Sequence, residues 1–299
     1  TNSLSGSIPI SITNLVNLHT LILAVNNLSG GIPPELGTMS NLNQLMLGSN
    51  PFSGDIPDEL GNLTNLFNLD LRACDLTGTI PASLGNLTNL NFLFLFFNDL
   101  TGTLPDELGN LVNLVNVSFN NNQLSGAVPD SFKNWTNLQF LNLADNNLSG
   151  DYLPDFTEQP LRQLWIQNNN FQFGEFENEF ITYSNTIDDF VYSPQKLSYI
   201  ATADINCDNN VCNPINDDVV LTFPISGNNN QYTWFKNGIE ILGETESELE
   251  IKDFSFEDDG TYTCRATNTV VTGLTLFSDG VGIFKPASQN PDYPALEAF

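Results

Sequence analysis

Histidine is almost absent from this sequence, because His19 is the only one in 299 residues. A single histidine leaves almost no residues from which a Ser-His-Asp or Cys-His catalytic group, or a histidine-ligated metal centre, could be built. No glycine-rich phosphate-binding loop follows the expected strand pattern. Acidic pairs such as Asp58-Glu59 and Asp106-Glu107 recur in matching contexts, which is typical of a solvated surface. We therefore expect no enzyme activity, no cofactor and no metal site.

Basic residues are also scarce, with eight Lys and Arg against 35 Asp and Glu and a formal net charge of -27. Nucleic acids and anionic membrane surfaces are poor partners for such a chain, because their binding depends on Lys and Arg neutralising phosphates. The excess of acid predicts a solubilising surface. Calcium or a cationic partner is the alternative interpretation.

Long apolar runs are missing as well. No stretch approaches the roughly 18 residues that span a bilayer, and no signal peptide is visible. We expect no direct membrane insertion in this fragment, which opens in the middle of a repeat at Asn2.

The first half of the chain repeats with a period of 24 residues. Leucines recur in the pattern L-x-x-L-x-L-x-x-N. A glycine is followed three positions later by the proline of an Ile-Pro, Leu-Pro or Val-Pro step, and only the last unit departs from this spacing, because Leu153-Pro154 lies one residue late. The repeated glycines are Gly6, Gly30, Gly54, Gly78, Gly102, Gly126 and Gly150. This period and pattern indicate leucine-rich repeats. Cys74 replaces the motif asparagine, a substitution that the motif accepts, so we expect it to be structural.

The sequence of these units resembles the plant-type leucine-rich repeat of receptor-kinase ectodomains, over roughly residues 1–170 and about seven units. The resemblance implies a curved solenoid with a parallel β-sheet on its concave face, and recognition proteins rather than enzymes. The first unit is truncated, and we expect the N-terminal cap to be missing or to lie outside the given sequence.

Aromatic residues interrupt the small and polar residues that flank the inward-pointing leucines. Strand alternation turns these flanking positions outward on the concave face. The predicted ligand-binding residues are Phe67, Asp70, Arg72, Phe92, Phe94, Phe96, Phe97, Asn116, Ser118, Phe140 and Trp165. Each exposed ring offers ~150–250 Å² of surface. The rings indicate a ligand site, unless a loop, the C-terminal domain or a second copy covers them.

The period stops after residue 170, and residues 171–196 are predicted to form a C-terminal cap and junction. The phrase from Phe190 to Gln195 resembles the ending of repeat arrays in bacterial cell-surface proteins.

Residues 197–286 carry short alternating runs that predict an all-β sandwich, followed by a tail over 287–299. The Y-T-W-F-K-N-G stretch around Trp234 and the D-x-G-x-Y-x-C stretch ending at Cys264 resemble strand C and the tyrosine corner of an immunoglobulin-like domain. Phe223 stands where the first cysteine of that domain is expected, so we predict Cys264 to be a buried free thiol.

Cys207 and Cys212 are close enough in sequence to form a disulfide, which an extracellular protein favours. A faint calcium-loop pattern at Asp204, Asn206 and Asp208 lacks the loop glycine and the final glutamate. It therefore does not change the expectation of no metal site.

Together these features predict a non-enzymatic extracellular or cell-surface protein for recognition or adhesion. It would bind a polysaccharide, protein or peptide on the concave face. The alternatives are a structural protein that forms homo-oligomers through the aromatic patch, and a receptor ectodomain for a peptide signal.

Overall fold

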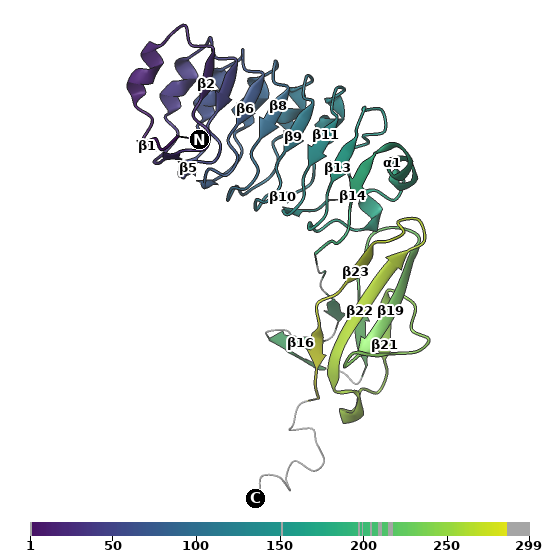
Figure 1. Ribbon diagram of the computed structural model, residues 1–299. Coiled ribbons are helices and arrows are strands. Elements are labelled where there is room, and N and C mark those ends of the chain that lie inside the picture. Colours follow the sequence, from purple (N-terminus) through teal and green to yellow (C-terminus); the bar gives the residue numbers. More distant parts are fainter. Residues whose placement is uncertain are drawn as a thin grey trace, which may run out of the picture. The chain divides into compact units, whose positions relative to one another are not determined.

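The computed structural model describes residues 2–150, 152–196, 198, 200–203, 205–208, 211–214 and 218–285 (Figure 1), with backbone only for 202–203, 205–208 and 211–214. It forms two compact units. Unit 1 comprises Thr1–Phe171 and Asn178–Ser193, and unit 2 comprises Gln172–Glu177 and Pro194–Phe299.

Unit 1 is built on an eight-stranded parallel sheet. In spatial order its strands are β2 (Thr20–Ile22), β4 (Gln44–Met46), β6 (Asn68–Asp70), β8 (Phe92–Phe94), β9 (Asn116–Ser118), β11 (Phe140–Asn142), β13 (Gln163–Trp165) and β14 (Asp189–Val191). Neighbouring repeats pair in register, so that Leu69 lies opposite Leu93. Both of these central leucines are fully buried. The predicted leucine-rich repeat solenoid with a concave parallel sheet is confirmed.

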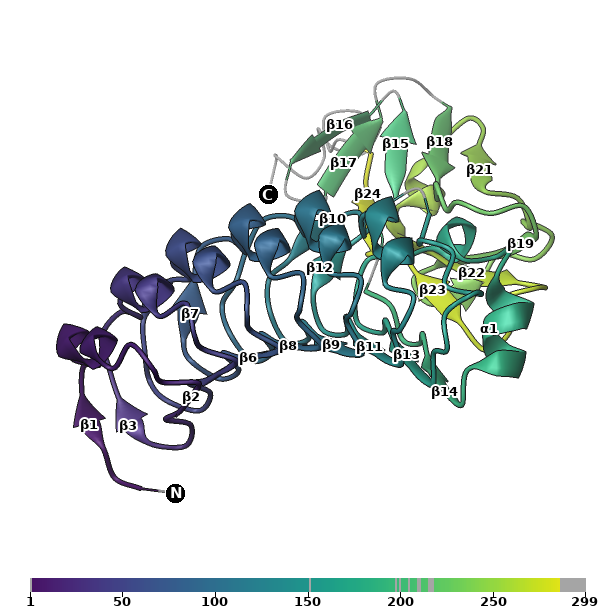
Figure 2. The same ribbon diagram turned by 90° about the horizontal axis from the view of Figure 1, so that it is seen from above.

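The opposite, convex side of unit 1 carries one 3-10 helix in each of the first six repeats (Figure 2). These helices are η1 (Ile10–Asn14), η2 (Pro34–Thr38), η3 (Asp58–Asn62), η4 (Ala82–Asn86), η5 (Asp106–Asn110) and η6 (Asp130–Asn134). A proline precedes each helix with φ between -59° and -74°. The proline ring holds φ in this range and removes a backbone donor that has no partner at a helix start.

Short parallel strand pairs run between the helices and the main sheet. They are β1 (Ser5–Gly6) with β3 (Asn27–Leu28), β5 (Gly54–Asp55) with β7 (Leu76–Thr77), and β10 (Ser125–Gly126) with β12 (Asn147–Leu148).

The motif asparagines form a buried ladder between the strands and these pairs. The amide of Asn98 donates to the carbonyls of Leu71 and Leu95, each at 2.9 Å, while its oxygen accepts from the backbone N–H of Cys74. Cys74 is fully buried, with its thiol 3.3 Å from the carbonyl of Arg72. Each amide satisfies backbone groups that burial would otherwise leave without partners.

The last part of unit 1 is aromatic. Helix α1 (Phe180–Thr186) precedes β14, and the rings of Phe180, Tyr183, Phe190 and Tyr192 contact one another. The Tyr183 hydroxyl donates to the carbonyl of Pro154 and accepts from the backbone N–H of Phe156. Burial raises the pKa of Tyr183 above its usual range.

Unit 2 contains two sheets. The smaller one orders β15 (Ala201–Ala203), β18 (Val219–Thr222) and β21 (Glu248–Ile251), all antiparallel. The larger one orders β16 (Ile205–Asp208), β17 (Val211–Pro214), β24 (Val281–Ile283), β22 (Gly260–Asn268), β19 (Asn230–Lys236) and β20 (Ile239–Glu240), with β23 (Thr275–Phe277) also on β22. Two short 3-10 helices, η7 (Phe173–Glu175) and η8 (Phe256–Asp258), complete the unit.

The core of unit 2 has the predicted immunoglobulin-like features. Trp234 lies opposite Cys264 in the β19–β22 register, and both are buried. The Tyr262 hydroxyl donates to the carbonyl of Asp258 at 2.6 Å, which is the expected tyrosine corner. Phe223 is fully buried and Cys264 is a free thiol.

Cys207 and Cys212 face each other in the β16–β17 register. Their side chains, and the calcium-like pattern that begins at Asp204, lie outside the described residues. The disulfide therefore stays a prediction.

Candidate ligand-binding face

Four phenylalanines of one repeat form a continuous row on the concave face of unit 1. The ring centroids of Phe92 and Phe94 are 6.4 Å apart, those of Phe94 and Phe96 are 6.2 Å apart, and those of Phe96 and Phe97 are 5.6 Å apart. The first three rings are half-buried, while Phe97 is 55% exposed. We call these four residues the phenylalanine row. The spacing suits edge and offset contacts between rings, so the row presents a preformed apolar surface.

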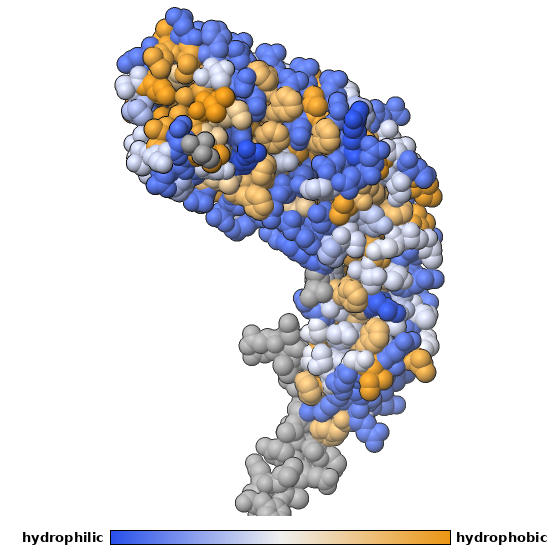
Figure 3. All heavy atoms as spheres, in the orientation of Figure 1, coloured by the Kyte–Doolittle hydropathy of each residue, from blue (hydrophilic) through white to orange (hydrophobic). Residues whose placement is uncertain are grey.

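Apolar side chains are also visible from outside the molecule. Figure 3 shows them gathered over the first repeats and over the central strands of the sheet, with polar side chains around them. Near the N-terminal edge strand β2, Ile22 and Val25 are exposed.

Phe97 adopts a left-handed backbone conformation, with φ of 55°. The same position of other repeats also has positive φ and is occupied by Val25, Ser49, Ala73, Asn121, Asp145 and Asn168. Asn and Asp tolerate this conformation best, whereas a bulky side chain there is unfavourable. The repeat therefore keeps an exposed aromatic ring where the backbone favours a small polar residue.

Arg72 lies between the phenylalanine row and a buried carboxylate. Its guanidinium is 5.7 Å from the centroid of the Phe96 ring, and its Nε is 3.4 Å from an oxygen of Asp70. Asp70 is only 1% exposed. Burial raises the pKa of Asp70, while the hydrogen bond from the Arg72 backbone N–H and the Arg72 charge act against this shift. Asp70 thus holds Arg72 in place and does not present its carboxylate to solvent.

Gly48 makes room for this ion pair. A Cβ at this position would lie 2.7 Å from a carboxylate oxygen of Asp70 and 2.9 Å from Cγ of Arg72. A larger residue would therefore force the Arg72 and Asp70 side chains to move.

Polar residues flank the phenylalanine row in the next repeat. Asn116 lies opposite Phe92 and Ser118 lies opposite Phe94, and both are half-buried. On the other side, Phe67 is half-buried directly before β6.

Phe140 and Trp165 lie farther along the same face. Strand β9 separates Phe140 from the row, and β13 carries Trp165 one strand beyond. The Trp165 indole N–H donates to Asp189 at 3.0 Å, and the Gln163 amide donates to the same oxygen. These residues form a second polar and aromatic position near the C-terminal edge of the sheet.

Three features of this face were missed by sequence reasoning. They are the left-handed backbone of Phe97, the space at Gly48 and the contacts of Asp189. The space at Gly48 had a signal in the sequence, because most other residues at the same repeat position carry side chains. The contacts of Asp189 had no such signal, because the strict period ends before that residue.

The described residues contain no group of three His, Cys, Asp or Glu side chains placed to hold a metal ion. In that same part of the chain, every helix is too short or too polar to cross a bilayer.

Family comparisons agree with the two-unit fold. The family model for the leucine-rich repeat region matches residues 2–172, and the model for the immunoglobulin domain matches residues 208–268. No curated protein matches the sequence significantly. The resemblance of Phe190–Gln195 to bacterial surface proteins stays a prediction.

Several plant receptor ectodomains have similar structures. The Arabidopsis receptor kinase HAESA, in complex with the peptide hormone IDA and the co-receptor SERK1, is 37% identical with a TM-score of 0.59, and the match covers 66% of this chain and 33% of that one. The plant peptide hormone receptor RGFR1 in complex with RGF2 is 32% identical with a TM-score of 0.61, covering 66% and 31%.

The ectodomain of GASSHO1/SCHENGEN3 from Arabidopsis thaliana, in complex with CASPARIAN STRIP INTEGRITY FACTOR 2, is 37% identical with a TM-score of 0.56. That match covers 57% of this chain and 20% of the receptor. The chain thus spans between a fifth and a third of the length of these three structures.

Proposed function

Because this chain belongs to the leucine-rich repeat family and carries an immunoglobulin domain, we propose that it is a non-enzymatic recognition protein. It binds a peptide, or a peptide segment of a protein, on the concave face of the solenoid. The phenylalanine row is the contact surface, and Arg72 lies at its edge.

The left-handed, exposed Phe97 is the observation that carries this proposal. A residue held in an unfavourable backbone conformation points to a role beyond stability. Half-buried aromatic rings offer a large contact area with little side-chain entropy to lose on binding. The row therefore suits a ligand that inserts apolar or aromatic side chains between or beside the rings.

The Arg72 ion pair makes the ligand class more specific. Asp70 already balances the charge of Arg72, so the site does not need an anionic ligand. The flat guanidinium, held beside the Phe96 ring, provides a further surface for stacking. We therefore expect the bound segment to be apolar at its centre and uncharged there.

Peptide is favoured over other ligands because several similar structures are complexes with peptide hormones. A polysaccharide is the second candidate, since sugar rings also stack on aromatic side chains. The polar side chains of Asn116 and Ser118 beside the row could hydrogen-bond its hydroxyls. In either case the protein works outside the cell, as a receptor-like or adhesion module, with unit 2 as a spacer or second contact.

A parallel screen on peptide and glycan arrays tests this proposal. Wild-type protein is compared with a Phe96→Ser/Phe97→Asn variant, and Ile22→Ser, at an exposed position of β2 in the same sheet, serves as the matched control. We expect a peptide signal that falls at least tenfold in the double variant and remains in the control. The melting temperature of each variant verifies folding.

Other outcomes of the screen decide against the proposal. Equal loss in the control would place the contact surface elsewhere on the face. A signal confined to glycans would assign the polysaccharide. Sedimentation of the free protein provides a separate test. A wild-type dimer that becomes a monomer in the double variant would mean that the row binds a second copy of this chain.

A further inference from the structure

The repeat that carries the phenylalanine row also departs from its neighbours on the convex side. Helices η3 and η5 begin with the acidic pairs Asp58-Glu59 and Asp106-Glu107, whereas η4 between them begins with Ala82-Ser83. Two carboxylate side chains are thereby replaced by a methyl group and a hydroxymethyl group. The surface between the flanking helices is left open.

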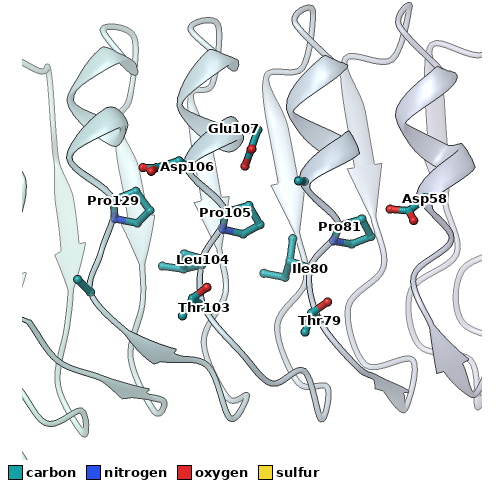
Figure 4. Close-up of a pocket in the computed structure, with 12 residues that line it drawn as sticks. Asp58, Thr79, Ile80, Pro81, Thr103, Leu104, Pro105, Asp106, Glu107 and Pro129 are labelled. Carbon is teal, nitrogen blue, oxygen red and sulfur yellow. The ribbon is translucent and has the colours of Figure 1, made fainter.

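A groove of about 750 Å³ lies at this place (Figure 4). The rings of Pro81, Pro105 and Pro129 form a row along it, and the threonines Thr79 and Thr103 lie on one side. The carboxyl groups of Asp58, Asp106 and Glu107 lie beside or above the prolines. The groove therefore combines an apolar floor with an acidic rim, and no basic residue lines it.

The aspartates of the rim lie beside serine hydroxyl groups, which do not neutralise them. Ser83 Oγ donates to the backbone carbonyl of Asp58 at 2.8 Å and lies 3.3 Å from its carboxylate. Ser131 Oγ donates to the backbone carbonyl of Asp106 at 2.9 Å and lies 3.4 Å from its carboxylate. None of the ion pairs found within the described ranges involves these carboxyl groups or Glu107.

Basic residues of the repeats are engaged elsewhere. Up to Gly150 the sequence holds only Arg72 and Lys133 as Lys or Arg. Arg72 pairs with Asp70 on the concave face, and Lys133 pairs with Asp130. These two residues therefore do not balance the negative charge of the rim, and a cation that does so must come from outside these repeats.

We propose that this groove is a second binding surface, which holds an extended, basic segment of a partner protein. The segment places a proline or another small apolar residue on the proline rings and two basic side chains against the acidic rim. Asp58 and Asp106 belong to repeats two apart, which is ~10 Å at the strand spacing of a parallel sheet. Two arginines three residues apart in an extended chain span a similar distance.

The test uses a fluorescein-labelled Arg-Pro-Ala-Arg peptide and fluorescence anisotropy at physiological salt. At this ionic strength charges separated by more than ~8 Å are largely screened, so general attraction by the acidic protein is reduced. A Glu-Pro-Ala-Glu peptide is the charge-reversed control. We expect binding of the first peptide only.

Two pairs of variants separate the groove from the net charge. Asp58→Asn/Asp106→Asn removes the rim charges, and Asp75→Asn/Asp99→Asn makes the same change in net charge at exposed positions outside the groove lining. We expect at least a tenfold loss of affinity in the first pair and less than a twofold change in the second. Equal losses in both would overturn the proposal.

A filling variant gives the sharpest outcome. Ala82→Asp/Ser83→Glu restores the acidic pair of the neighbouring repeats, so the chain already shows that the helix accepts these residues. It adds two negative charges, and the side chain introduced at Ala82 occupies the groove, which Ala82 lines. We expect at least a tenfold loss of affinity. Tighter or unchanged binding would mean that charge alone attracts the peptide, and the proposal would be wrong.

Discussion

Phe97 combines an exposed aromatic ring with a left-handed backbone. At this residue the effect of a substitution on ligand binding can therefore be separated from its effect on folding stability. A left-handed conformation costs an ordinary side chain about 1 kcal/mol or more, and asparagine tolerates it. The contact of the Phe97 ring with Phe96 returns part of this cost.

Replacing Phe97 with asparagine should therefore weaken ligand binding without weakening the fold. Relief of the backbone conformation favours the variant by about 1 kcal/mol, and loss of a half-exposed ring contact costs about 0.5 kcal/mol. We expect the free energy of unfolding in urea to rise slightly. Ala73→Asn is the control, because Ala73 has a φ of 48° at the same repeat position and no ring. A loss of more than about 1 kcal/mol in Phe97→Asn, but not in the control, would show that the ring is part of the core.

Consecutive 3-10 helices stack through glycines in their fourth position. A Cβ on Gly85 would lie 2.3 Å from the backbone oxygen of Glu107 in the next helix, and Gly37 and Gly61 make equally close approaches to the helices that follow them. Lys133 occupies this position in η6, and the period breaks after that repeat. The glycines therefore set how closely neighbouring repeats stack on the convex side.

Gly85→Ala should destabilise unit 1 strongly, because backbone atoms cannot move aside as a flexible side chain can. We expect a loss of about 3 kcal/mol in the free energy of unfolding, at the upper end of overpacking costs. Gly54→Ala is the control. Gly54 has a φ of 80°, and a Cβ there would have no atom within 4 Å, so the loss should be only about 1 kcal/mol. Equal losses in both variants would mean that the repeats can separate freely.

Among the side chains that the structure describes, each unit contains one buried free thiol, Cys74 in unit 1 and Cys264 in unit 2. Burial raises the pKa of both thiols to about 12. The unfolded chain releases these protons from about pH 9, whereas the folded protein retains them. The unfolded state then binds fewer protons, so stability falls as the pH rises.

The whole protein should therefore lose stability in alkaline solution between about pH 9 and pH 12. At pH 10 each thiol contributes a loss of about 1.4 kcal/mol. Urea unfolding at pH 8 and pH 10 measures the change, and Cys264→Ala should reduce it for unit 2. Burial also raises the pKa values of Tyr183 and Tyr262, so the variant should retain part of the effect. A stability that is equal at both pH values would contradict buried thiols.

Much of the fold could be predicted because its rules are local or strictly periodic. Alternation placed Leu69 and Leu93 inside, the motif placed Asn98 in the ladder, and the short motif around Tyr262 identified the tyrosine corner. The contacts of Asp189 could not be predicted in the same way, since they join residues 24 and 26 positions apart after the repeat pattern has ended.

The sequence by itself determined the period, the inward leucines and the repeat position of each aromatic residue on the concave face. Strand alternation and a fixed repeat length are sufficient for this, because a residue's place in the repeat decides which side of the sheet its side chain lies on. Only the tertiary structure decided which outward positions are open. Asp70 belongs to an outward column yet is buried, because Arg72 covers it in the space that Gly48 leaves. The convex groove is open because the small side chain of Ala82 lies between the acidic residues Asp58 and Asp106 of the neighbouring repeats. Exposure therefore depends on which side chains the adjacent repeats place beside a residue.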